Sequence, residues 1–173
     1  MKRSDIKEIP EYFDYYINLV DDIELSEAFD KSLKQIDGLD IGKLKRIGLK
    51  VYADGKWSVH RIIQHLTDWE RIWCYRTVLF ARREGTVPRG LDQEKMGENS
   101  NADELPIELL IAELRAVRIA TKAMFDTFNQ QIFETNCNFY KYEMSVFAMG
   151  YTIIGHQLHH FGVIEERYFP LDK

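Results

Sequence analysis

Three long segments of the sequence carry apolar residues at the spacing of an α-helix, and this pattern limits the chain to a helical fold. We expect helices at Ser58 to about Arg83, at residues 103–106 to about Asn129, and from Ser145 to a point before Pro170. Ser58 and Ser145 suit helix starts, because a serine hydroxyl accepts a hydrogen bond from a backbone N–H of the first turn. Apolar residues that recur every three to four positions indicate that each helix buries one face.

The connections between these segments complete the prediction of the fold. Apolar spacing between Pro10 and Asp37 predicts one interrupted helix or two short ones. Residues 84–102, rich in Gly, Pro and Asn, predict a long loop of the kind that forms lids or binding loops. Residues 130–144 could contain a short extended piece. We therefore predict an all-α fold, an antiparallel four-helix bundle, as a single domain over residues 1–173.

Composition, charge and missing motifs exclude several classes of protein. The net charge is −5 and no large basic patch is present, so nucleic acid is not an expected partner. No apolar run approaches the roughly 18 residues of a membrane span, and the N-terminus lacks a signal-peptide pattern. Cys74 and Cys137 form no CxxC, which favours a reducing cytoplasm. G-x-G-x-x-G, P-loop, H-E-x-x-H and G-x-S-x-G motifs are all absent.

Three of the five histidines lie in the sequence GHQLHHFG, between Gly155 and Gly162. His156 and His160 are four residues apart, so on a helix they share one face. His65 lies on the apolar stripe of the helix that begins at Ser58, and we expect its side chain to point into the bundle. Three imidazoles that meet there could bind a zinc ion and leave one position open. The alternative is a set of core histidines that binds no metal.

Three further polar residues are candidates near such a site. His159 could act in proton transfer or lie on the helix surface. Asp68 lies three residues after His65. It could orient a ligand histidine through a hydrogen bond or be an ordinary surface acid. Arg76 falls on the same stripe and could bind an anionic substrate group, or pair with an acid such as Glu113. His60 lies off the stripe, and we expect it to face solvent.

The order of these motifs resembles that of the DinB/YfiT-like superfamily. The resemblance rests on GKWSVHRIIQHLTDWERIWCYRTVLFARR, on the middle segment ELRAVRIATKAMF and on GHQLHHFGVIEERY, and it covers the chain from about Pro10 to Tyr168. It implies a four-helix bundle with a divalent metal, zinc or nickel, on three histidines. By motif these are His65, His156 and His160. The resemblance also implies a homodimer.

The family includes metal-dependent thiol S-transferases, which use low-molecular-weight thiols such as bacillithiol, a mycothiol-dependent isomerase, and members described as metal-dependent hydrolases. The resemblance therefore predicts a thiol S-transferase that acts on a small-molecule substrate with a low-molecular-weight thiol as cosubstrate. Two alternatives stay open: a hydrolase that uses metal-activated water, and a non-catalytic metal-binding or stress-response module. The chain departs from the pattern at Thr152, where many relatives carry a further histidine.

Overall fold

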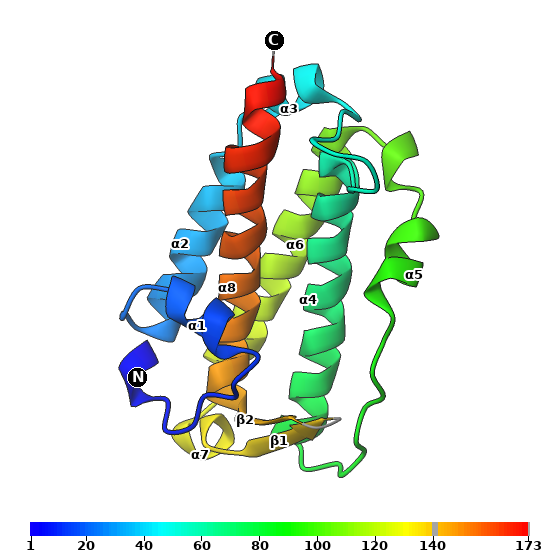
Figure 1. The fold of residues 1–173 in the computed structure, drawn as a ribbon. Coiled ribbons are helices and arrows are strands. Elements are labelled where there is room, and N and C mark those ends of the chain that lie inside the picture. The colour runs from blue at the N-terminus through cyan, green and yellow to red at the C-terminus, as the bar shows by residue number, and fades with distance from the viewer. Residues whose placement is uncertain (140–141, 173) are drawn as a thin grey trace.

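Four long helices pack side by side in the computed structural model, which describes residues 1–139 and 142–172 (Figure 1). They are α2 (Leu25–Asp37), α4 (Val59–Ala81), α6 (Ile107–Asp126) and α8 (Val146–Val163). Going round the bundle, α2 packs on α6, α6 on α4, α4 on α8, and α8 on α2. The predicted fold class, an all-α four-helix bundle, is confirmed.

Two neighbouring helices run in one direction along the bundle, and the other two run in the opposite direction. Figure 1 shows α4 and α6 running down the bundle and α2 and α8 running up it. Side-chain contacts agree, because Glu70 pairs with Arg118 and, one turn further along both helices, Cys74 contacts Thr121. The neighbours α2/α6 and α4/α8 are therefore antiparallel, whereas α4/α6 and α2/α8 are parallel. The predicted antiparallel arrangement thus holds for two of the four neighbouring pairs. A parallel α4/α6 pair requires the crossover of residues 82–106, which returns the chain to the end where α4 began.

Short elements connect and close the bundle. They are η1 (Arg3–Asp5), α1 (Asp14–Leu19), α3 (Ile41–Ile47), α5 (Gln93–Glu98), η2 (Ala102–Glu104), α7 (Gln130–Phe133), β1 (Asn136–Phe139), β2 (Tyr142–Ser145), η3 (Ile164–Tyr168) and η4 (Phe169–Leu171). The N-terminal region thus forms two separate helices, and the expected extended piece is an antiparallel hairpin with Asn136 opposite Ser145. The crossover, predicted as a loop, carries α5 and η2. None of the described helices has both the length and the apolar character of a membrane span.

The predicted starts of two long helices are confirmed, and one burial prediction is wrong. Ser58 Oγ accepts from the Arg61 N–H at 3.2 Å, and Ser145 Oγ accepts from the Ala148 N–H at 3.1 Å. His60 was expected to face solvent but is only 8% exposed. Spacing along α4 does not reveal this burial, because it depends on other elements: Asp103 of η2 and Glu108 of α6 lie close enough to act electrostatically on His60.

A polar layer crosses the bundle between two apolar clusters. One cluster gathers residues of α1, α2 and α8 near the hairpin, and the other surrounds α3 and the starts of α4 and α6. Between them, both carboxylate oxygens of Glu70 accept from Arg118, each at 2.8 Å, with the two side chains at most 2% exposed. Arg118 also donates to Ser32 Oγ, and Gln157 donates to the Ser32 carbonyl at 3.1 Å. All four long helices thus contribute to one hydrogen-bonded layer.

Removing one member of the buried pair should destabilise the fold strongly. Glu70→Gln keeps the side-chain volume but leaves the Arg118 charge buried without a carboxylate, and we expect a loss of about 3–5 kcal/mol in the free energy of unfolding. Arg71→Gln is the matched control. Arg71 pairs with Glu113 between the same two helices at a solvent-exposed position, and this change should cost at most about 1 kcal/mol. Urea denaturation measures both; equal costs would contradict the role given to the layer.

Candidate metal centre

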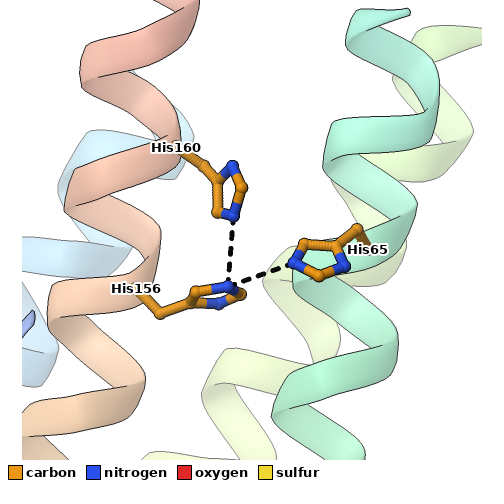
Figure 2. A group of neighbouring side chains, drawn as sticks. All are labelled: His65, His156 and His160. Carbon is orange, nitrogen blue, oxygen red and sulfur yellow. Dashed lines mark hydrogen bonds between the residues drawn. The ribbon is translucent and has the colours of Figure 1, made fainter. Parts of the chain in front are cut away.

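Three histidines from two helices converge at the level of this polar layer. Figure 2 shows His65 on α4 facing His156 and His160 on α8. Nε2 of His156 lies 3.1 Å from Nε2 of His65 and 3.1 Å from Nε2 of His160. One possible ligand atom from each residue lies within 4.8 Å of the others. The structure therefore brings together the three residues that the sequence selected, with the i, i+4 pair on one face of α8.

The surroundings keep these imidazoles neutral. His65 is 8% and His156 6% exposed, and His160 is partly buried. Burial disfavours the charged form, and it lowers the pKa of His65 to about 4 and that of His160 to about 2. Burial, followed by the neighbouring histidines, lowers the pKa of His156 well below its ordinary value. At neutral pH each ring therefore retains a nitrogen lone pair that can bind a cation.

Aromatic rings enclose the cluster. The Tyr16 and Trp73 rings stand edge-on to His156, with centroids 5.4 and 4.8 Å away. Trp57 lies 5.1 Å from His65. A wall of this kind limits access of water and lowers the local dielectric, which strengthens the electrostatic interactions of any ion held there.

The donor set fits a divalent metal better than it fits a hydrogen-bonded trio. An imidazole Nε2 has either one N–H or one in-plane lone pair, so His156 can complete a good hydrogen bond to only one of its two neighbours. A metal accepts a lone pair from each of the three rings. Zinc–nitrogen bonds of about 2.0–2.1 Å in tetrahedral geometry separate ligand nitrogens by about 3.3 Å, close to the spacing seen around His156. Three protein ligands also leave a position for a substrate atom.

Gly155 allows α1 to close against the cluster. A Cβ at this position would overlap the backbone carbonyl of Tyr16. The absence of a side chain lets α1 lie directly on α8, and this contact places the Tyr16 ring beside His156. At Gly162, by contrast, a Cβ would meet no atom of the described residues within 4 Å. Of the two glycines that flank the histidines, only Gly155 is required by packing.

We expect Gly155→Ala to displace α1. The added methyl group must push the Tyr16 backbone away, at a cost of about 1–3 kcal/mol in the free energy of unfolding. Gly162→Ala is the control, and it should be neutral or stabilise the helix by up to about 1 kcal/mol, since alanine has the higher helix propensity. Chemical denaturation compares the two variants. Similar stabilities would show that α1 does not depend on the close approach.

His159 lies next to the cluster but outside it. Its Nδ1 is 3.0 Å from the Tyr15 hydroxyl, and its ring stands edge-on to Tyr16 and His160 at centroid distances of 5.7 and 4.8 Å. Partial burial lowers its pKa. It lines the same cavity as the three clustered histidines, so it is close enough to exchange a proton with a molecule bound there.

Asp68 is not brought to the histidines. Its carboxylate accepts from Gln64 Nε2 at 2.9 Å, and burial raises its pKa. It lines a separate cavity together with Glu113. Although Asp68 follows His65 by three residues on α4, its carboxylate is hydrogen-bonded within its own helix and to no ligand histidine among the described residues.

Arg76 is buried, as its place on the stripe predicts, but the acid suggested as its partner is engaged elsewhere. Its side chain is 5% exposed, its Nη2 donates to the Arg89 carbonyl at 3.1 Å, and its guanidinium lies 5.7 Å from the Trp69 ring centre. Glu113 accepts from Arg71 instead. The two arginines lie on different sides of α4: Arg71 faces α6, whereas Arg76 faces the crossover.

Two cavities flank the cluster. The first, here called the polar cavity, measures about 330 Å³ and is lined by the three clustered histidines, His159, Lys56 and Glu94 among others. The second, here called the aromatic cavity, measures about 390 Å³ and is lined by Trp69, Trp73, Tyr142 and Arg76 among others. His156, Tyr12, Tyr16 and Gln93 line both. The sequence indicated His156 but not Tyr12, Tyr16 or Gln93, because these three come from the N-terminal region and the crossover.

The comparisons with known proteins agree with the fold. The sequence profile of the DinB superfamily matches residues 15–164, so the chain belongs to this superfamily. YfiT from Bacillus subtilis, described as a probable metal-dependent hydrolase with an unusual four-helix bundle topology, superposes with a TM-score of 0.66 at 22% identity, over 92% of this chain and 88% of YfiT. A DinB-like protein from Bacillus cereus superposes with a TM-score of 0.54 at 18% identity, over 80% and 81%. No curated protein matches significantly.

Metal content tests the centre directly. Purified wild-type protein should hold about one divalent ion per chain, and the His156→Ala, His160→Ala double variant should hold none, because one remaining imidazole cannot bind the ion tightly. His159→Ala is the matched control and should retain the metal. Elemental mass spectrometry gives the ratio, and circular dichroism shows that each variant is folded. A folded wild-type protein that stays metal-free with added Zn²⁺ and Ni²⁺ would refute the centre.

Proposed function

We propose that this DinB-superfamily protein is a metal-dependent enzyme, and that it transfers a low-molecular-weight thiol to an electrophilic small molecule. The observation that supports the proposal is that three neutral imidazoles lie together between two cavities, one lined by all three and the other by His156. In this proposal His65, His156 and His160 hold a divalent ion, zinc or nickel. When bound, such an ion supplies Lewis acidity that lowers the pKa of a thiol or a water molecule.

The chain's own residues then have separate roles. The rings of Tyr16, Trp57 and Trp73 exclude bulk water from the histidines. His159 is proposed to accept the proton that leaves the thiol; the Tyr15 hydroxyl at its Nδ1 would hold the ring in place. The thiol sulfur forms a bond to the electrophilic carbon, and the leaving group departs with the electron pair of the broken bond. Asp68 is given no part, because it lines a different cavity.

The presence of two cavities favours transfer over hydrolysis. A thiol transfer needs two organic molecules next to the same metal, and each cavity is of a size that holds one small molecule. Hydrolysis needs one organic molecule and water. The second candidate, a hydrolase, draws on the description of YfiT as a probable metal-dependent hydrolase. A third, a non-catalytic metal-binding or stress-response module, would require that neither cavity takes a substrate.

Turnover assays separate these candidates. Metal-loaded wild-type protein should consume a chromogenic electrophile such as 1-chloro-2,4-dinitrobenzene only when a thiol such as cysteine or bacillithiol is present. The His156→Ala, His160→Ala variant should lose at least about 100-fold in rate, since thiol activation is lost. His159→Ala should keep its metal and lose rate mainly at lower pH. Equal turnover of p-nitrophenyl acetate with and without thiol would favour the hydrolase instead.

The quaternary structure and location stay predictions. The homodimer expected from the family would need a surface that the single chain leaves uncovered, and α1 exposes Tyr15 and Leu19 on its outer side. The small-molecule substrate and the cytoplasmic location follow from the proposed activity and from the cysteine pattern.

A further inference from the structure

The aromatic cavity combines a buried cation with a wall of flat rings. From this combination we propose that it binds an aromatic carboxylic acid, with the carboxylate on Arg76 and the ring packed against Trp69 and Trp73, whose own rings are in contact at a centroid distance of 5.7 Å. The proposal rests on the proposed function, because it names the class of electrophilic substrate brought to the histidines. It assigns the acid to the aromatic cavity and leaves the polar cavity to the thiol.

The charge of the cavity favours an anion. Arg76 is 5% exposed, and a guanidinium so far from water is stabilised by a carboxylate that binds it through two N–H groups. Arg89, on the crossover, also lines the cavity. No Asp or Glu occurs among the described residues that line it. An acid that enters therefore meets positive charge and no competing carboxylate from the described lining residues.

The walls of the cavity favour a flat apolar body. Phe13, Trp69, Trp73 and Tyr142 supply four aromatic rings, and the volume of about 390 Å³ falls within the range of about 300–1,000 Å³ typical of ligand sites. Aromatic rings pair well with other rings, through offset stacking or edge-to-face contact. The indole N–H of Trp69 is buried and has no acceptor among the described residues. A ligand oxygen brought close to this ring would satisfy the donor.

The distances between wall residues limit the length of the acid. The Trp69 ring centre lies 5.7 Å from the Arg76 guanidinium and 6.1 Å from the His65 ring. Trp73 contacts His156 at a centroid distance of 4.8 Å, and His156 itself lines the cavity. An acid whose carboxylate is bound at Arg76 therefore needs only a ring and a short chain to bring its far end to the histidines.

A binding experiment tests this without any turnover. The probes are 3-phenylpropanoate and its neutral amide, 3-phenylpropanamide, titrated while the fluorescence of the tryptophans is followed. Two of the three tryptophans of the chain line the cavity, so a bound ring should change their emission. We expect the acid to bind at least about tenfold more tightly than the amide, and Arg76→Met to abolish this preference. Arg76→Lys should retain part of it.

Two controls separate Arg76 from other cations. Arg82→Met removes an exposed arginine at the end of the same helix, whose guanidinium lies over Phe128, and it should leave the preference unchanged. His160→Ala removes a proposed metal ligand that does not line the aromatic cavity, and it should also keep the preference. Circular dichroism and urea denaturation check that each variant is folded. If Arg76→Met does not fold, the comparison of wild-type protein with Arg76→Lys replaces it.

The outcomes are distinct. Equal binding of acid and amide by folded wild-type protein would overturn the proposal. A preference that is lost in His160→Ala but kept in Arg76→Met would also overturn it, since the carboxylate would then be bound by the metal. Retention of the preference in His160→Ala with loss in Arg76→Met supports it. Because these arms need no turnover, a failure of the proposed enzyme activity would leave this result readable.

Discussion

The buried ion pair between Glu70 and Arg118 is the interaction on which the rest of the structure depends. It lies between two apolar clusters, whose contacts are non-directional, and it joins α4 to α6 through paired hydrogen bonds. Ser32 and Gln157 extend it to α2 and α8. A buried charge left without its partner is costly, so this layer sets the register of the four helices. Gln157 adjoins His156, and the histidines meet at the level set by the same register.

Exclusion of water from the histidines follows from a second constraint, the close approach of α1 to α8 at Gly155. This contact places Tyr16 against His156, and Trp57 and Trp73 complete the enclosure. Burial in turn lowers the pKa values of the clustered histidines and keeps them neutral. One glycine therefore links backbone packing to the burial that keeps His156 neutral and able to donate a lone pair to a metal.

The direction of the helices explains where small molecules can bind. Because α4 and α6 are parallel, the chain must return along the outside of the bundle, and Figure 1 shows this crossover with α5 beside α4. Gln93, the first residue of α5, lines both cavities, and Arg89 closes over the Arg76 side chain. The crossover thus contributes residues to both cavities, whereas the histidines and the Trp69, Trp73 and Arg76 side chains come from the long helices.

The sequence by itself determined the helical class, the serine caps at Ser58 and Ser145, and the three histidines that meet. These depend on local spacing, since a period of 3.6 residues decides which side chains share a face. Tertiary structure alone decided the burial of His60, the separation of Asp68 from the cluster, the Glu70–Arg118 pair and both cavities. These features depend on which helices pack against each other. The local sequence pattern does not decide this, because a crossover of residues 82–106 can connect α4 to an α6 that runs either parallel or antiparallel to it. Contacts between elements distant in the chain are settled by packing.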